Sequence, residues 1–193
     1  MATAEILFVC TGNVCRSPLA ERLLRNGLDA LWAPSGADVL VHSAGTRALV
    51  GQPMTAETVA QLDSCGGTAA GFAARQLDLE MTRSATLVLA LTRAHRGPVV
   101  EHHPAAARVT FTLREIARLL ADVPAESVPG VTAAQRVHAV TQLAIRRRGL
   151  LPPVGLGEDD VTDPYGGNLD RYRTTTAEIL PAVQLLLRVL GPR

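Results

Sequence analysis

The sequence predicts a single-domain α/β fold in which a four-stranded parallel sheet carries helices on both faces. Two observations predict it: short apolar runs alternate with amphipathic helical stretches, and 193 residues suffice for one domain with its own core. Alternating strands and helices form parallel sheets with right-handed crossovers, so functional loops are expected at the carboxyl ends of the strands. We therefore expect one domain over residues 1–193.

The first strand, Ile6 to Val9, is an unbroken apolar run that ends in a glycine-containing loop. The helix that follows shows one apolar stripe, formed by Leu19, Leu23, Leu24, Leu28 and Leu31. Glu21, Arg22 and Arg25 lie off this stripe and are expected to face away from the core. Ser17 is a candidate N-cap for this helix.

The alternation then repeats. A second strand is expected over Val39 to Ser43, and a helix that opens at about Thr55 reaches Ser64 before two glycines stop it. Thr86 to Leu91 is the most apolar strand candidate, and Arg108 to Phe111 is a weaker one. Another amphipathic helix is expected from Thr112 through Leu120, so four strands alternate with helices.

The last third of the chain differs in its content of proline and glycine. Proline and glycine segments between about residues 122 and 157 flank a helical stretch from Thr132 to Arg148, which we interpret as an insertion packed on the same domain. The final helix is expected from about Leu169 to Leu190. Pro181 lies inside it and is expected to bend or divide it.

Composition and charge exclude several classes of function. The formal net charge of +1 gives no overall field for nucleic acid, and no aromatic-basic interleaving suggests stacked bases. No stretch approaches a membrane span and no basic region precedes the first apolar run, so a cytoplasmic protein without membrane insertion is expected. Three cysteines, an odd number, are expected to be reduced. Five histidines lack metal-ligand spacing and are expected at the surface: His42, His95, His102, His103 and His138.

The loop of residues 10–17, Cys-Thr-Gly-Asn-Val-Cys-Arg-Ser, carries the chemistry. Between a strand and a helix, such a loop directs backbone N–H groups and the positive end of the helix dipole at one point, where an oxyanion binds. Cys10 would lie in the same field, which favours its nucleophilic thiolate. Arg16 adds a planar pair of donors for two phosphoryl oxygens. Gly12 and Asn13 permit the backbone conformations of a tight anion-binding loop.

Other phosphate loops fit less well, because the segment has no Lys-Ser/Thr pair of a nucleotide P-loop and no Gly-x-Gly-x-x-Gly turn. The alternative is that Cys10 is a buried residue at a strand end and Arg16 a surface residue, each common by itself. The strand, loop and helix context favours the functional interpretation. The phosphate-binding residues are then Thr11, Gly12, Asn13, Val14, Cys15, Arg16 and Ser17.

These residues resemble the low-molecular-weight protein-tyrosine phosphatases and their arsenate-reductase relatives. The family pattern Cys-x-Gly-Asn-x-Cys-Arg-Ser-Pro, after an N-terminal apolar strand, is matched over residues 10–18. Four later segments are similar and fall in the family's order: residues 43–46, 51–53, 74–77 and 163–166. The resemblance covers most of the chain except about residues 122–157.

The resemblance implies hydrolysis of phosphotyrosine in two steps, in which the Cys10 thiolate attacks phosphorus and water then hydrolyses the cysteinyl-phosphate. It implies no metal and no organic cofactor. It also implies that Asp163 is the acid for the leaving oxygen and the base for the water. On the residues alone, Asp163 competes with four other carboxylates, Glu158, Asp159, Asp160 and Asp170. Pro164 would stiffen the backbone at Asp163, although an Asp-Pro pair is more often only a turn.

Further roles follow from the resemblance. Cys15 matches a second loop cysteine that, in part of the family, forms a reversible disulfide with the nucleophile. Tyr165 matches an aromatic wall for the substrate ring. Ser43, with the loop asparagine, matches a hydrogen-bond network beneath the loop. Phe72 stands where that network commonly has a histidine, so the support of the loop is expected to differ.

The implied substrate is a tyrosine-phosphorylated protein, of which a tyrosine kinase is one candidate. Val14 is apolar where relatives acting on phosphoarginine carry threonine, which favours phosphotyrosine. One rival function is an arsenate reductase, although Cys65 does not match the later cysteine pair of thiol-coupled reductases. The other rival is a non-catalytic phosphate-binding module. Ser17 stays open between an N-cap and a hydroxyl that donates to the thiolate.

Overall fold

The structure, a computed structural model, describes residues 3–33, 38–152, 154–155 and 157–192. Its centre is a four-stranded parallel sheet with the order β2-β1-β3-β4. The strands are β1 (Ala4–Cys10), β2 (Val39–Gly45), β3 (Leu87–Ala90) and β4 (Thr110–Thr112). In the register, Cys10 pairs with Gly45 and Val9 with Ala90, so the carboxyl ends of the inner strands meet at one edge of the sheet.

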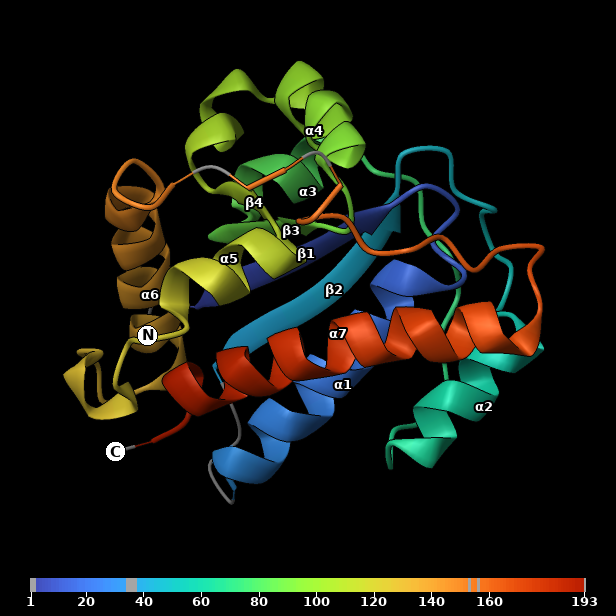
Figure 1. Cartoon of the computed structure of the whole chain (residues 1–193), viewed down its shortest axis with the longest axis horizontal. Helices are drawn as coiled ribbons and strands as arrows, with labels where there is room; N and C mark the ends of the chain where they lie inside the picture. The colour runs from blue at the N-terminus through green and yellow to red at the C-terminus, as the bar shows by residue number, and fades with distance from the viewer. Residues whose placement is uncertain (1–2, 34–37, 153, 156, 193) are drawn as a thin grey trace.

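Seven α-helices surround the sheet in the described part of the chain (Figure 1). They are α1 (Arg16–Leu31), α2 (Ala56–Ser64), α3 (Leu79–Ser84), α4 (Arg96–His102), α5 (Leu113–Leu120), α6 (Ala133–Arg148) and α7 (Leu169–Leu190). Three short 3-10 turns join them: η1 (Arg93–His95), η2 (Pro104–Arg108) and η3 (Ala125–Ser127). The predicted α/β class and its four strands are confirmed.

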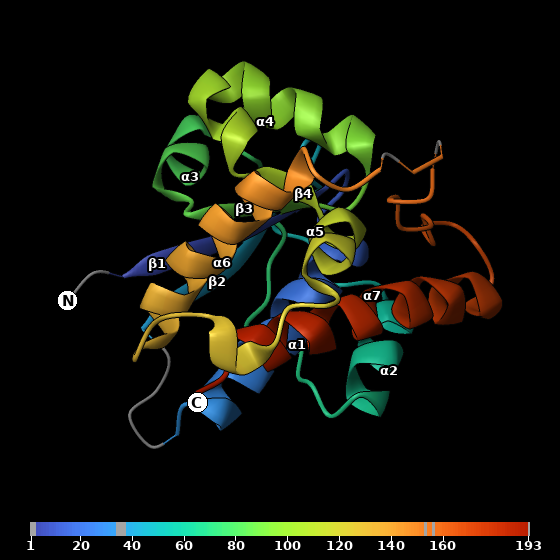
Figure 2. The same ribbon diagram turned by 60° about the vertical axis from the view of Figure 1, so that its left-hand side comes forward.

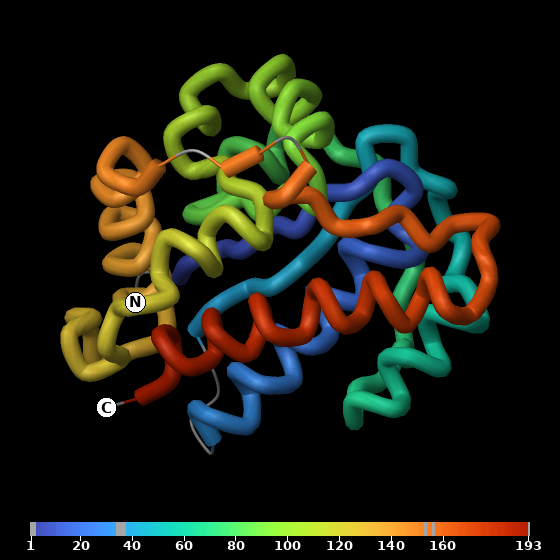
Figure 3. Tube along the Cα trace, viewed as in Figure 1, coloured from blue at the N-terminus to red at the C-terminus, as the bar shows by residue number. Residues whose placement is uncertain are grey.

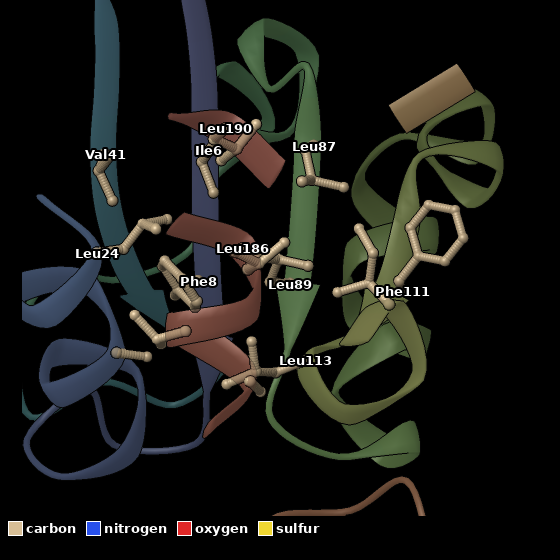
Figure 4. Close-up of a cluster of buried hydrophobic side chains, with 14 of the residues drawn as sticks. Ile6, Phe8, Leu24, Val41, Leu87, Leu89, Phe111, Leu113, Leu186 and Leu190 are labelled. Carbon is tan, nitrogen blue, oxygen red and sulfur yellow. The ribbon is translucent and has the colours of Figure 1, made fainter. Parts of the chain in front are cut away.

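Each face of the sheet buries its own core. On one face Ile6, Phe8, Leu87 and Leu89 pack against apolar residues of α1, α5, α6 and α7, as Figure 4 shows for the central part. On the other face, alternate residues of the same strands, such as Leu7 and Val88, pack against the α3 and α4 region. Side chains alternate between faces along a strand, so these nearly continuous apolar strands supply both cores. Figure 1 shows α3 and α4 on one side of the sheet and α1 and α7 on the other.

The helix α1 departs from its predicted solvent face. Leu19, Leu23, Leu24 and Leu28 are buried as expected, but Leu31 is 42% exposed. Glu21 and Arg22, expected to face solvent, are buried at 1% and 9% exposure. The reason is that β2 and the loop around Phe72 cover this side of the helix, where Glu21 and Arg22 find polar partners.

Local side-chain caps explain several helix boundaries. Thr55 caps α2 by accepting a hydrogen bond from Thr58 N, and Thr112 and Glu115 form a reciprocal capping box at α5. The final helix α7 runs unbroken from Leu169 to Leu190 with Pro181 inside it, as the red tube in Figure 3 shows. Of the two expected effects of Pro181, a division of the helix is therefore wrong, and a bend stays a prediction.

The helical stretch predicted within residues 122–157 is α6, which lies beside the sheet in Figure 2. Ala134, Val137, Val140 and Ala144 on α6 join the main core, so this segment packs on the same domain. Its status as an insertion relative to the family stays a prediction. Among the helices that the structure describes, none combines the length and the apolar character that crossing a bilayer requires.

Candidate active site

The loop after β1 is held from outside by the segment that follows β2. The carbonyl oxygens of Thr11 and Gly12 accept hydrogen bonds from the backbone N–H groups of Arg47 and Leu49, at 3.0 Å each. This contact needs Gly45, because a Cβ there would lie 2.5 Å from the Thr11 carbonyl oxygen. With its carbonyl groups turned outward, the loop turns its N–H groups inward.

Several of those N–H groups are free to bind an anion. Among the described residues, the N–H groups of Gly12, Val14, Cys15 and Arg16 have no acceptor. Asn13 has a φ of 56°, the left-handed conformation that asparagine tolerates better than most residues. Gly12 has no positive φ, so the role expected for it is wrong; Asn13 provides the turn instead. Gly12 lines the pocket, where the missing side chain leaves room for a ligand.

The Cys10 thiol lies at the floor of this cradle, 2% exposed as a residue. Ser17 Oγ lies 2.9 Å from Cys10 Sγ, and the Asn13 N–H donates to the same sulfur at 3.3 Å. Hydrogen bonds donated to sulfur stabilise a thiolate relative to a thiol. The N-cap of α1 is Cys15, not Ser17, because the helix begins at Arg16; the Ser17 hydroxyl accepts from Asn13 Nδ2 beneath the loop. The structure therefore places Ser17 Oγ beside Cys10 Sγ.

Arg16 and Asp163 meet across the mouth of the cradle. Arg16 Nη2 and Asp163 Oδ2 are 2.7 Å apart, and the side chain of Asp163 is 51% exposed while that of Arg16 is 6% exposed. Arg16 also donates to the Val161 carbonyl oxygen at 3.4 Å. A cavity of about 270 Å³ lies here, and its walls are formed by Cys10, Thr11, Gly12, Asn13, Val14, Cys15, Arg16, Arg47, Leu49, Asp163 and Tyr165.

The other carboxylates that competed with Asp163 are engaged elsewhere. Asp159 is buried and pairs with Arg118 at 3.0 Å, and Asp160 accepts from the Arg93 N–H at 2.6 Å. Asp170 lies on the surface at the start of α7, and the Glu158 side chain accepts from a neighbouring loop N–H. Of the five candidates, Asp163 alone lines the cavity.

A buried polar network supports the loop from below. Asn13 Nδ2 donates to Ser17 Oγ at 2.9 Å and to Ser43 Oγ at 2.8 Å, while the Arg75 N–H donates to Asn13 Oδ1 at 2.8 Å. The Ser43 hydroxyl donates to Glu21 Oε2 at 2.6 Å. Asn13 and Ser43 are thus bonded to each other beneath the loop, and Glu21 continues the network to Arg25, whose Nη2 lies 3.0 Å from Glu21 Oε1.

Phe72 lies to one side of this network. Its ring packs on the cluster of Val14, Cys15 and Tyr172, and Arg22 lies over it at 5.6 Å from the ring centre. Phe72 therefore contributes apolar contact, and no polar group is missing beneath Asn13.

Cys15 points away from the cradle floor. Its sulfur lies 3.6 Å from Thr55 Oγ1 and 3.9 Å from Tyr172 Oη, and burial raises the pKa of the Cys15 thiol. All three cysteines of the chain are free thiols in this structure. The redox role of Cys15 stays a prediction.

His95 and His42 are buried at 6% exposure each, so the expectation that all five histidines lie at the surface is wrong for these two. His95 Nε2 lies 2.9 Å from Thr11 Oγ1, and His95 Nδ1 lies 2.9 Å from Thr92 Oγ1. Burial first, and then the charge of Arg16, lower the pKa of His95 to about 4. A neutral His95 thus fixes the first residue of the loop after Cys10. Among the described residues no group of His, Cys, Asp and Glu side chains could hold a metal ion.

The family model for low molecular weight phosphotyrosine protein phosphatases matches residues 5–124, which include the whole cradle. The chain belongs to this family. One curated relative is the low molecular weight protein-tyrosine-phosphatase Etp of Escherichia coli K12, 40% identical over 100 residues. That match covers 52% of this chain and 62% of Etp, so this chain spans less than two thirds of Etp.

Other members of the family match along nearly the whole chain. The protein-arginine-phosphatase of Geobacillus stearothermophilus is 31% identical over 186 residues, which are 96% of this chain and 95% of that protein. The crystal structure of a low molecular weight protein tyrosine phosphatase from T. tengcongensis has a TM-score of 0.67 at 29% identity and covers 95% of this chain and 97% of its own. The family thus includes members named for two phosphoresidues.

The sequence did not predict that four residues line the cavity or support the loop: Arg47, Leu49, Glu21 and His95. Arg47 and Leu49 line the cavity because the segment after β2 folds over the loop, and no local pattern marks them. Glu21 carried a weak signal, since a lone acid between leucines on a core helix can be drawn inward by a buried partner. His95 had the signal of lying shortly after the third strand, at the functional edge of the sheet.

We expect acid to destabilise the protein through His95. Its pKa is lower in the folded protein than its ordinary value of 6.5, so the unfolded chain binds more protons between about pH 6.5 and pH 4, and the free energy of unfolding falls as pH falls through this range. From pH 7 to pH 5 the His95 contribution is about 2 kcal/mol.

Urea unfolding of the wild type and of His95→Gln at both pH values measures this contribution. The variant should lose less stability than the wild type on acidification. The pKa of His42 is also lowered by burial, but His42 is present in both proteins and cancels in the comparison. Equal losses in the two proteins would show that His95 does not carry the effect.

Proposed function

We propose that the protein hydrolyses phosphotyrosine in protein substrates through a cysteinyl-phosphate intermediate. One observation carries the proposal: the Cys10 sulfur lies in a cradle of free N–H groups whose mouth is closed by the 2.7 Å pair of Arg16 and Asp163. The cradle suits a phosphoryl group, the sulfur is placed to attack it, and the carboxyl group is placed above it.

In the first step, Cys10 Sγ forms a bond to phosphorus and the bond to the tyrosyl oxygen breaks. Asp163 donates a proton to the departing oxygen, which leaves as a phenol. The free N–H groups and Arg16 hold the three equatorial oxygens of the phosphoryl group during transfer. Arg16 then exchanges its contact with Asp163 for contacts with these oxygens, which frees the carboxyl group for proton transfer.

In the second step, water attacks the cysteinyl-phosphate. Asp163, now a carboxylate, takes a proton from the water, the S–P bond breaks, and the Cys10 thiolate returns with the Ser17 hydroxyl beside it. Phosphate leaves as the product. A solved neighbour supports a covalent intermediate: a Cys-to-Ser variant of the arginine phosphatase YwlE, 28% identical over 95% of this chain, carries a phosphorylated active-site serine.

Phosphoarginine is the second candidate substrate, and the named relatives include enzymes for both residues. The walls of the cavity favour the aromatic ring. Val14 and Leu49 are aliphatic and Tyr165, at 60% exposure, is aromatic, so the walls offer contact area to a flat ring. Val14 offers no acceptor to the N–H groups of a phosphorylated guanidinium, which would lose hydrogen bonds to water on entry.

The test compares two peptides of one sequence, one with phosphotyrosine and one with phosphoarginine. We expect kcat/KM at least tenfold higher for the phosphotyrosine peptide, a difference of about 1.4 kcal/mol. Val14→Thr is nearly isosteric and adds an acceptor, so it should lower the ratio of kcat/KM for the phosphotyrosine peptide to that for the phosphoarginine peptide. Faster hydrolysis of phosphoarginine by the wild type would assign the other substrate.

Two further results would replace the proposal. If the protein binds phosphate but does not hydrolyse p-nitrophenyl phosphate, it is a binding module. If it consumes reduced thioredoxin or a small thiol only in the presence of arsenate, it is a reductase. The structure offers little support to the latter, because Cys65 lies at the end of α2 and is not among the cavity residues. A cytoplasmic location and a tyrosine kinase as the partner stay predictions.

A further inference from the structure

A second cavity, of about 460 Å³, shares no wall residue with the active-site cavity. Four guanidinium groups line it, from Arg93 in η1, Arg96 in α4, Arg118 in α5 and Arg148 at the end of α6; these helices can be followed in Figure 2. Two carboxylates, Glu115 and Asp159, also line it. Four cations against two anions leave this cavity with an excess of two positive charges.

Two of the four arginines account for both carboxylates. Arg148 binds Glu115 with two hydrogen bonds, at 2.7 Å and 3.0 Å, and Arg118 binds Asp159 at 3.0 Å. Such short paired contacts are what a structural ion pair requires. The cluster of Arg148 and Glu115 is further fixed, because Arg148 also lies over the ring of Phe111.

The other two arginines are poorly paired. Arg93 shares Asp159 at 3.4 Å, and Arg96 comes no nearer to a described carboxylate than 3.8 Å, to Glu115. The Arg96 N–H donates to the Arg93 carbonyl oxygen, but the Arg96 side chain donates no hydrogen bond to any acceptor in the described part of the chain. Burial first, and then the nearby charge of Arg148, lower the pKa of Arg96, while Glu115 and Asp159 raise it.

The poorly paired arginines flank the residue that holds the catalytic loop. Arg93 and Arg96 stand on either side of His95, whose ring contacts Thr11. The Arg93 N–H donates to Asp160 Oδ1 at 2.6 Å, three residues before Asp163. A ligand on Arg93 and Arg96 would therefore bind to the segment of residues 93–96. This segment contacts the phosphate loop through His95 and Thr11, and it contacts the loop that carries Asp163 through Arg93 and Asp160.

We propose that the cavity of Arg93, Arg96, Arg118 and Arg148 is a second anion site, which binds a phosphate-type dianion, free or carried by a small molecule. A dianion balances the excess charge, and planar guanidinium groups match the oxygens of a phosphoryl group in pairs. The cavity exceeds the size of one phosphate ion, so an ester fits as well. The proposal does not depend on hydrolysis at Cys10.

The test is a titration of the wild type with inorganic phosphate, followed by nuclear magnetic resonance of arginine Nε–H groups and of loop backbone amides. Arg96 and Arg148 Nε–H signals report on the second site, and the amides of residues 11–17 report on the active site. We expect both sets to shift and saturate, with separate dissociation constants. A parallel titration with methylphosphonate, which resists hydrolysis, distinguishes an ester ligand from the free ion by which of the two binds more tightly.

Arg96→Gln removes one charge from the second site without breaking a described hydrogen bond, so it is expected to fold. It should weaken phosphate binding reported by Arg148 at least tenfold and leave the constant of the loop amides unchanged. Arg83→Gln, an exposed arginine on α3, is the matched control and should change neither. Absence of saturable shifts at Arg96 and Arg148 in the wild type, or an unchanged constant in Arg96→Gln, would overturn the proposal.

Discussion

Cys10→Ser is expected to reduce hydrolysis of aryl phosphates by about 10⁴-fold or more. A serine hydroxyl is not ionised at neutral pH and is a much weaker nucleophile than a thiolate, even though it would lie where Ser17 Oγ and the Asn13 N–H now contact Cys10 Sγ. The protein should still bind phosphate with an affinity within a few-fold of the wild type, because the free N–H groups and Arg16 are untouched. Steady-state hydrolysis of p-nitrophenyl phosphate and calorimetric titration with phosphate measure the two quantities.

Cys65→Ser provides the matched control for this loss. It makes the same chemical change at a thiol outside the cavity, so the rate should stay within about twofold of the wild type. If Cys10→Ser keeps more than a tenth of the activity, Cys10 is not the nucleophile. If it also loses phosphate binding, the variant has disturbed the cradle and Cys10→Ala must confirm the result.

Asp163→Asn is expected to slow turnover by about 10²- to 10⁴-fold for substrates whose leaving group is a poor one. Asparagine keeps the shape and can still lie beside Arg16, but it cannot protonate the departing oxygen. The substitution should therefore lower kcat much more for phenyl phosphate, which has a basic leaving oxygen, than for p-nitrophenyl phosphate. The leaving oxygen of p-nitrophenyl phosphate departs with little need of a proton. The measurement is kcat over a series of substituted phenyl phosphates, with the slope against leaving-group pKa compared between variant and wild type.

Asp170→Asn is the matched control, because Asp170 is an exposed carboxylate on the surface of α7. Its slope should equal that of the wild type. An Asp163→Asn variant with the same slope as the wild type and a uniformly lower rate would show that Asp163 organises Arg16 and does not act as the acid. Their 2.7 Å contact makes this the alternative that the experiment must separate.

The cradle was predictable because its information is local. A short apolar strand, the spacing of Cys10 and Arg16, and a following amphipathic helix lie within one continuous segment, and a strand-loop-helix unit turns its N–H groups inward whatever the rest of the chain does. The error at Gly12 was also local: Gly12 and Asn13 both tolerate unusual backbone conformations, and the register of the loop, set by contacts from residues 46–55, decides that Asn13 adopts one and Gly12 does not.

Asp163 was separable from its competitors only with the family resemblance beside Pro164 and Tyr165. Nearby carboxylates in one loop look alike in sequence. The role of each depends on which group lies opposite it in the folded protein. Asp159 forms an ion pair with Arg118, and Asp160 accepts a hydrogen bond from the Arg93 N–H; both partners lie more than forty residues away in the sequence. Asp163 forms its ion pair with Arg16 at the cavity. No periodicity in the sequence encodes those pairings.

The sequence by itself determined the α/β alternation, the parallel sheet and the strand-loop-helix cradle that contains Cys10 and Arg16, because each depends on the period of apolar residues or on contiguous spacing. The tertiary structure alone decided which polar residues leave the solvent. Glu21 on a helix and His95 after a strand each have a local partner, Arg25 or Thr92, but their burial also needs a partner across the fold, Ser43 or Thr11, in place of the water they lose. Such long-range compensation depends on three-dimensional proximity, which no local pattern carries.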